Sequence, residues 1–149
     1  MLSPRPSRQS GEDNLHPLNP VVANLKLLSI KAESYHWNVT GANFGSLHKL
    51  FEDIDTVADE WSDIVAERLR GLQHPVKSTA GYYHEVRWFS EGVHSYDSSE
   101  MLSDMVETLE TITSHVTRLF DTEDDVTSNI LQELVAAIDK LAYFVRSSR

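Results

Sequence analysis

Five side chains in two neighbouring stretches of the sequence have the types and the spacing of metal ligands. His36 and His48 stand twelve positions apart, on either side of an Asn-Val-Thr-Gly break. Glu52 follows four positions after His48, and Asp63 and Glu67 form a second pair four positions apart. Imidazole is the commonest metal ligand among side chains. Because the set offers only nitrogen and oxygen donors, it suits Fe(II), Mn(II) or Zn(II) better than a soft metal.

The two pairs on the second stretch would lie along one line of a single helix. Residues four apart share a helix face, and the eleven positions from Glu52 to Asp63 make about three turns. The line from His48 to Glu67 is then about 28 Å long, too long for one metal site. Two antiparallel copies related by a twofold axis would bring His48 and Glu52 of one chain opposite Asp63 and Glu67 of the other.

His36 would join this arrangement across the short break, so the expected site has two imidazoles and three carboxylates shared by two subunits. Without a cation, each close pair of carboxylates would repel by about 4 kcal/mol at an effective dielectric of 20. Two divalent ions would offset that repulsion. The alternative interpretation is a solvated acidic helix face with two incidental histidines.

A di-metal centre inside one bundle is a second alternative. It needs a Glu from each of two helices and a Glu-x-x-His motif from each of the other two. Glu33-Ser-Tyr-His36 matches that motif, and so does Glu91-Gly-Val-His94, but the second lies in a glycine-containing link. The last long helical segment has no histidine. The pattern therefore disfavours this type of centre.

The elements that would carry these residues are long amphipathic helices. Apolar residues recur at steps of three and four, which is the helical period. We expect four such helices, with glycine or proline near two of the ends, over about 18–37, 46–72, 98–120 and 130–145. A short helix around 81–89 lies in the long link between the second and third.

Four long helices with one long middle link predict an all-α, ferritin-like four-helix bundle, since such a link can cross the bundle from end to end. Gly41, Gly71 and Pro75 are the expected helix stops. Asp97, or one of the two serines after it, is the expected cap of the third long helix. We expect one domain over 18–149, preceded by a flexible polar tail over 1–17.

Composition excludes several other classes of function. The 149 residues contain no cysteine, which rules out disulfides and thiolate metal sites. No apolar run approaches the ~20 residues of a membrane span, and the N-terminus has no apolar signal region, so we expect a cytoplasmic protein. The formal net charge of −10 disfavours nucleic-acid binding. Arg5 and Arg8 of the tail are offset by Glu12 and Asp13.

Two stretches, "HWNVTGANFGSLHKLFEDI" and "DIVAERLRGL", resemble the Dps mini-ferritins, the DNA-binding proteins from starved cells. The likeness covers about 18–147. It implies a hollow homododecamer built from twofold dimers. It also implies a ferroxidase that oxidises Fe(II) with hydrogen peroxide or O2 at an intersubunit di-iron site. Ferric mineral would be stored inside the cage, which would protect the cell from oxidative stress.

The resemblance assigns roles residue by residue. His36, His48, Asp63 and Glu67 match the ligand positions of the family, whereas Glu52 stands where the family usually has Asp. A Glu reaches one methylene further, so the second iron position would shift or weaken. Trp37 matches an aromatic residue beside the site that could accept oxidising equivalents, and packing in the interface is an equally good interpretation.

The family also brings iron in through acidic pores on threefold axes, near the start of the last helix. Four acidic residues lie there in this sequence, Asp121, Glu123, Asp124 and Asp125. Capping of the helix and interaction with its dipole explain acidic residues at such a position equally well. Asn129 stands where many relatives have a pore Asp, which predicts a less acidic pore.

The sequence leaves two further functions open. A nucleoid protein is one, although the tail has none of the lysines on which DNA binding in the family usually depends, so binding is expected to be weak or absent. A cage with a zinc-occupied, weakly oxidising site is the other, because of Glu52. The remaining histidines are expected to serve packing or to lie at the surface: His16, His74, His84, His94 and His115. An extra metal site at His84 and His94 in the middle link is the alternative to packing.

Overall fold

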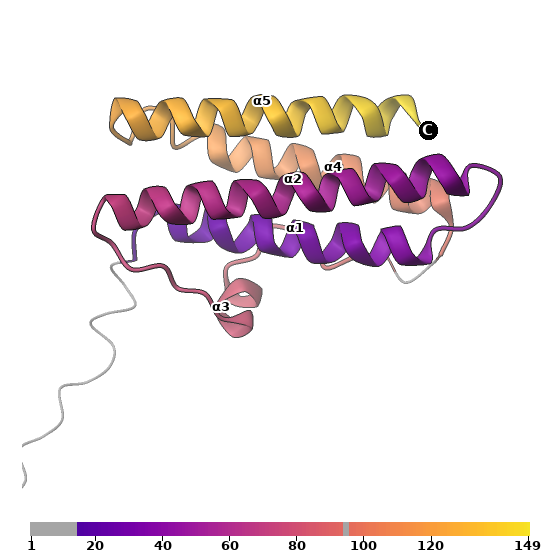
Figure 1. Ribbon diagram of the computed structural model, residues 1–149, viewed down its shortest axis with the longest axis horizontal. Helices are drawn as coiled ribbons and strands as arrows, with labels where there is room; N and C mark the ends of the chain where they lie inside the picture. The colour runs from indigo at the N-terminus through magenta and orange to yellow at the C-terminus, as the bar shows by residue number, and fades with distance from the viewer. Residues whose placement is uncertain (1–14, 94–95) are drawn as a thin grey trace, which may run out of the picture.

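The computed structural model describes residues 15–93 and 96–149, and over these residues the chain is entirely helical apart from turns and links. Four long helices run side by side and a short one lies outside them (Figure 1). This confirms the predicted four-helix bundle with an extra helix in the long link. The helices are α1 (Leu18–Asn38), α2 (Phe44–Gly71), α3 (Ala80–Glu85), α4 (Ser98–Thr117) and α5 (Asp125–Ser147).

The helix ends differ in detail from those that the sequence predicts. After α1 the chain turns extended at Val39, and the positive φ of Gly41 (109°) lies inside the turn and not at the helix end. α2 begins at Phe44, two residues earlier than expected. The side chain of Asp97 accepts the Ser99 N–H at 2.9 Å, so Asp97 is the cap of α4 among the three candidates.

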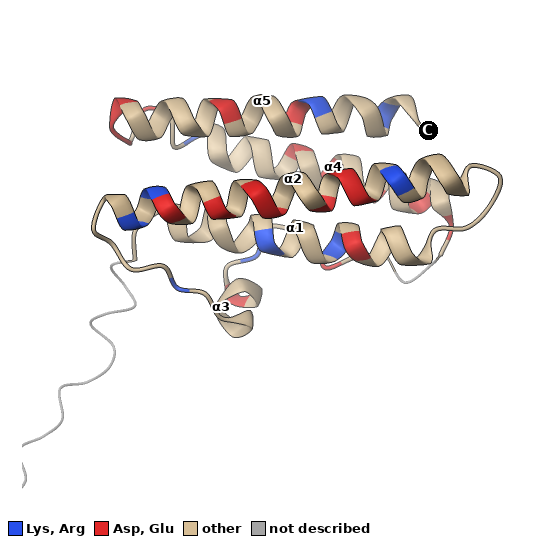
Figure 2. Cartoon of the chain, viewed as in Figure 1, with Lys and Arg blue, Asp and Glu red and all other residues tan. Residues whose placement is uncertain are grey.

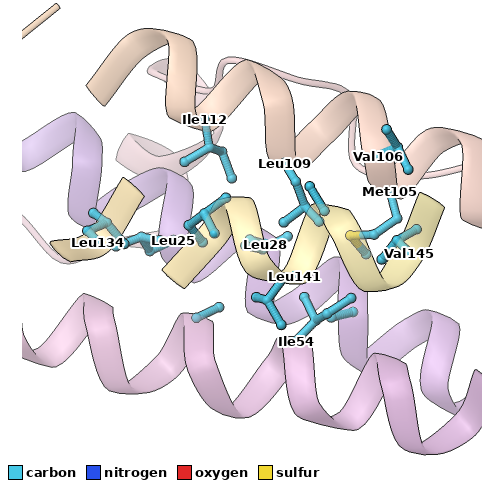
Figure 3. Close-up of a cluster of buried hydrophobic side chains, with 14 of the residues drawn as sticks. Leu25, Leu28, Ile54, Met105, Val106, Leu109, Ile112, Leu134, Leu141 and Val145 are labelled. Atoms are coloured by element: carbon cyan, nitrogen blue, oxygen red, sulfur yellow. The ribbon is translucent and has the colours of Figure 1, made fainter. Parts of the chain in front are cut away.

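The apolar stripes of the four long helices meet in one core (Figure 3). Leu28 from α1, Ile54 from α2 and Leu109 from α4 are fully buried, and Leu141 of α5 is 5% exposed. Full burial of one such side chain stabilises a fold by about 1.5–3 kcal/mol. α1 packs chiefly against α2, and α4 against α5, so two helix pairs form the bundle. No helix in the described ranges is long and apolar enough to cross a membrane.

A buried polar cluster joins α1 to α4 and to the long link. The ammonium of Lys31 donates to Asp104 Oδ2 at 2.8 Å and to Thr108 Oγ1 at 2.7 Å. The hydroxyl of Tyr35 donates to the same Asp104 oxygen at 2.5 Å and accepts the Val93 N–H at 3.1 Å. Because buried polar groups are costly unless paired, this cluster fixes the position of the C-terminal turn of α1, which carries His36.

Candidate metal centre

His36, near the end of α1, and His48, in the second turn of α2, meet across the turn that joins these helices. Their ring centroids are 3.7 Å apart and the rings are inclined by 19°, a stacked pair. The ring of Phe44 covers His48 from a centroid distance of 5.0 Å. The predicted proximity of the two imidazoles is therefore confirmed.

Each of the two rings is held by the main chain of the other residue. Nδ1 of His36 lies 2.7 Å from the carbonyl oxygen of His48, and Nδ1 of His48 lies 2.7 Å from the carbonyl oxygen of His36. A carbonyl oxygen can only accept, so both Nδ1 atoms carry a proton and donate. In the neutral rings both Nε2 atoms then keep a free lone pair. Metal-binding histidines are commonly oriented by such a bond from the other ring nitrogen.

Acidic residues recur along α2 (Figure 2), and the predicted ligand Glu52 lies apart from the pair Asp63 and Glu67 on this helix. Glu52 is exposed one turn beyond His48, and Asp63 and Glu67 are exposed further along the same helix. By helix rise, Asp63 is about 16 Å beyond Glu52. We call His36, His48 and Glu52 the histidine half, and Asp63 and Glu67 the acidic half.

Within one chain the two halves do not make a complete site. Among the described residues, no three His, Asp or Glu side chains gather closely enough to hold a metal ion. The histidine half is no exception, so the carboxylate of Glu52 does not reach the two imidazoles. The second Glu-x-x-His motif of a centre inside one bundle, Glu91-Gly-Val-His94, is described only in part, because His94 lies outside the described residues.

Large apolar side chains lie exposed on both helices that carry the predicted ligands. Trp37 is 68% exposed, and Ile30, two turns earlier on the same face of α1, is 60% exposed. Ile64, next to the acidic half on α2, is 41% exposed. Exposed aromatic and aliphatic residues that cluster on one face are typical of contact surfaces. The α1–α2 face therefore has both halves of the predicted centre and the character of an interface.

The acidic half is anchored to α5 through the residue after Glu67. Arg68 donates from Nε to Thr127 Oγ1 and from Nη2 to Asp124 Oδ1, both at 2.9 Å. On the other side, Lys26 of α1 donates to Asp59 at 2.8 Å, one turn before Asp63. These contacts hold the backbone of α2 at the position where the two carboxylates project from it.

The four acidic residues near the start of α5 have different surroundings. Asp124 accepts the N–H and the hydroxyl of Thr127, at 2.9 and 2.6 Å, and so caps the helix. These bonds, with the nearby Arg68, lower the pKa of Asp124 to about 2. Glu123 is largely buried, and its carboxylate lies 3.6 Å from Nε2 of His16. Asp121 and Asp125 are exposed.

The other described histidines serve packing or lie at the surface. His115 stacks on Trp88 with centroids 4.3 Å apart, in agreement with the packing interpretation. His84 is exposed, 3.7 Å from Glu91. His16 differs from the surface position that the sequence suggests, because it is half-buried and its Nδ1 accepts the Leu18 N–H at the start of α1. Its place just before the helix was the signal for this hydrogen bond.

Comparison with known proteins decides the family. The model of the ferritin-like domain matches residues 16–148. The DNA protection during starvation protein of Listeria innocua is 33% identical over 129 residues, which cover 83% of each chain. The chain belongs to the Dps family. Dps from Bacillus brevis has the same fold with a TM-score of 0.83 and 28% identity, over 87% of this chain and 90% of that chain.

A more distant Dps shares the fold alone. Dps from Vibrio cholerae O1 is 24% identical and superimposes with a TM-score of 0.81, over 87% of this chain and 84% of that chain. Its structure is described as that of a member of a broad superfamily of ferritin-like diiron-carboxylate proteins. The family assignment thus agrees with the resemblance in the "HWNVTGANF" stretch, and it covers the whole helical part of this Dps chain.

Proposed function

We propose that this Dps-family chain is a ferroxidase that binds Fe(II) as its substrate, oxidises it with hydrogen peroxide or O2, and stores the ferric product in a dodecameric cage. The observation that carries the proposal is the reciprocally held pair of His36 and His48, whose two Nε2 lone pairs are free for metal. Family membership supports a general role in iron storage or DNA protection. The diiron-carboxylate description of the Vibrio cholerae protein supports the choice of iron.

The centre would be completed by a second copy of the chain. An antiparallel twofold arrangement of two α2 helices places the histidine half of each chain opposite the acidic half of the other. One dimer then contains two equivalent centres. The exposed Trp37 and Ile30 support this arrangement, since an interface on the α1–α2 face would bury both.

The donor set suits the oxidation of Fe(II) in pairs. Two imidazoles and three carboxylates supply hard and intermediate ligands that hold Fe(II) and favour the more highly charged Fe(III). Two Fe(II) ions give up two electrons, and one hydrogen peroxide with two protons takes them up to form two waters. Because both electrons leave together, no hydroxyl radical is released. Trp37, next to His36, is the nearby aromatic residue that would donate an electron if only one iron were present.

Entry of Fe(II) would use the exposed carboxylates at the start of α5. Asp121 and Asp125 are free to face a pore between subunits. Asp124 and Glu123 have partners inside the chain, namely Arg68 with Thr127, and His16. We therefore expect the attraction of the pore for cations to come mainly from Asp121 and Asp125, with Asp124 holding the rim of the pore in shape.

The test compares Fe(II) oxidation in the wild type and in Glu67→Ala with hydrogen peroxide below one equivalent per two irons. We expect Glu67→Ala to lose the fast phase of oxidation, because the acidic half then has one carboxylate. Glu100→Ala is the matched control, since Glu100 is an exposed carboxylate at the start of α4. Equal rates in the wild type and Glu67→Ala would refute the proposed site.

A further inference from the structure

A hollow of about 360 Å³ lies beside the acidic half, between α1, α2 and the segment that follows α2. Three carboxylates of α2 line it, and Asp63 is one of them. All the residues in its wall belong to the described part of the chain, and Lys26 of α1 is the single cation among them. A positive charge thus shares a hollow with a predicted metal ligand.

The ammonium of Lys26 is held on the α2 side of the hollow by Asp59. Nζ of Lys26 donates to Asp59 Oδ1 at 2.8 Å, and this hydrogen bond is the largest reason that the pKa of Lys26 is raised. Partial burial acts in the opposite direction, and the charges of Asp59, Tyr83 and Asp63 raise the pKa further. Lys26 is therefore a permanent cation at neutral pH, and its charge interacts with that of Asp63.

We propose that Lys26 is an internal counter-charge that lowers the affinity of the acidic half for divalent metal. The inference rests on the proposed function and deepens it, since it names a residue that regulates the same centre. A cation that lines the same hollow as Asp63 repels a second cation that binds to this carboxylate. Lys26 is not a ligand of the metal, and its charge affects the metal through Asp63. Its effect keeps bound metal exchangeable, so that iron passes on to the store after oxidation.

A plain surface ion pair is the competing explanation for the contact between Lys26 and Asp59. The side chains are 39% and 63% exposed, and pairs of this kind contribute little to folding. Removal of the charge at Lys26 will therefore leave the fold intact. The two explanations differ in one respect: an ion pair that serves only stability predicts that metal affinity is independent of Lys26.

The experiment titrates the purified full-length protein with Co(II) alone, which does not oxidise under these conditions, and follows binding by visible absorption and calorimetry. Lys26→Gln removes the charge, and Lys26→Arg keeps it. We expect Lys26→Gln to bind Co(II) about three- to tenfold more tightly, the scale of one unit charge acting through solvent on a divalent ion. The difference will shrink as the salt concentration rises. Lys26→Arg and the control Lys140→Gln on α5 will match the wild type.

Kinetics give a second readout that a structural role would not change. We expect the KM for Fe(II) to fall in Lys26→Gln while kcat stays the same or falls, because tighter binding of substrate does not speed its oxidation. Equal Co(II) affinities in the wild type and Lys26→Gln would overturn the proposed role of Lys26. Binding of Co(II) that is tightened as much in Lys26→Arg as in Lys26→Gln would overturn it as well. A wild type that binds no Co(II), or binds it unchanged after Glu67→Ala, would overturn the metal centre and this inference with it.

Discussion

Nδ1 of His36 donates to the main-chain carbonyl of His48, and Nδ1 of His48 donates to the main-chain carbonyl of His36, both over 2.7 Å. The acceptor of each ring is thus the backbone of its partner and not the partner's ring. A substitution of one side chain removes one imidazole but leaves the acceptor of the other imidazole in place. The contribution of each ring to metal binding can therefore be measured separately.

Replacement of His48 by Phe uses this separation. The Phe ring can still stack on His36, and the carbonyl of residue 48 still accepts from it, but both ring nitrogens of His48 are lost. We expect Fe(II) oxidation to slow by about tenfold or more, with a loss of only about 1 kcal/mol in the free energy of unfolding for the missing hydrogen bond. Stopped-flow absorbance and urea unfolding measure the two effects.

His115→Phe is the matched control, because His115 is likewise a stacked histidine whose Nδ1 contacts a carbonyl oxygen, at 3.0 Å. It packs on Trp88, outside the α1–α2 face, and we expect unchanged oxidation. A similar loss of rate in both variants would mean that the effect of His48→Phe comes from the fold and not from a lost ligand.

The length of the side chain at position 52 gives the next prediction. Glu52 is exposed one turn from His48, and it does not reach the imidazoles within its own chain. Glu52→Asp shortens the side chain by one methylene and restores the residue usual in the family. We expect oxidation to become roughly two- to tenfold faster, since small displacements of a reacting group have effects on that scale or larger. Stopped-flow rates at equal iron loading check this.

Elemental analysis of the same variant tests the zinc alternative. A zinc-occupied site in the wild type that becomes iron-loaded in Glu52→Asp would show that position 52 decides the choice of metal.

Glu33→Ala tests the rival centre inside one subunit, because Glu33 belongs to its Glu-x-x-His motif. We expect no change in oxidation rate for Glu33→Ala, and a large loss would favour the rival centre.

The fold and the meeting of His36 with His48 could be predicted from the sequence because both depend on local patterns. Apolar residues at helical spacing define the four long helices. The turn between α1 and α2 has only five residues, so it brings His36 and His48 close together. The reciprocal hydrogen bonds could not be predicted, since they depend on where the carbonyls of α1 and α2 point. The pairing of the histidine half with the acidic half stays a prediction, because it depends on contacts between two copies of the chain.

Long-range polar contacts were the other feature that the sequence hides. Lys31 lies among apolar neighbours in the pattern of α1, and its partner Asp104 is 73 positions away. A lysine is almost never fully buried unless it is paired, so burial of Lys31 could be predicted only with Asp104 already in place. Arg68 and Asp124 are likewise far apart in the sequence, by 56 positions, so local patterns do not predict their contact.

The cluster around Lys31 gives a prediction about stability. Lys31→Met leaves Asp104 without its ammonium partner, and the side chain of Lys31 is fully buried. We expect the free energy of unfolding to fall by about 3 kcal/mol, the usual cost of breaking a buried pair on one side. The double variant Lys31→Met with Asp104→Asn will recover part of this loss. Urea unfolding at one fixed protein concentration measures both, and a larger loss in the double variant would contradict the pairing.

DNA binding can be tested against the charge of the chain. The formal net charge is −10, and the tail over 1–14, which lies outside the described residues, has two arginines, two acidic residues and no lysine. We expect no gel shift of duplex DNA at ~0.15 M salt, because counterion release needs several phosphate contacts. A variant with three lysines inserted after Met1 is the positive control. A shift by the wild type that persists as salt is raised would refute the prediction.

The cap of α5 predicts how stability depends on acid. Two hydrogen bonds from Thr127 and the charge of Arg68 hold the pKa of Asp124 at about 2, below the ordinary value of 3.8. Because the folded chain prefers the ionised carboxylate, this stabilisation is complete above the ordinary pKa. It is lost as the pH falls from about 4 to about 2. Thermal unfolding of the wild type between pH 2 and pH 6 will show this component.

Asp124→Asn keeps an oxygen that can accept the Thr127 N–H but has no charge to titrate. We therefore expect the unfolding temperature of Asp124→Asn to vary less with pH over this window than that of the wild type, with the two curves converging at the acid end. Arg68→Met will reduce the pH dependence of the unfolding temperature only in part, since the hydrogen bonds from Thr127 lower the pKa of Asp124 more than Arg68 does. Parallel curves for the wild type and Asp124→Asn would show that folding does not lower the pKa of Asp124.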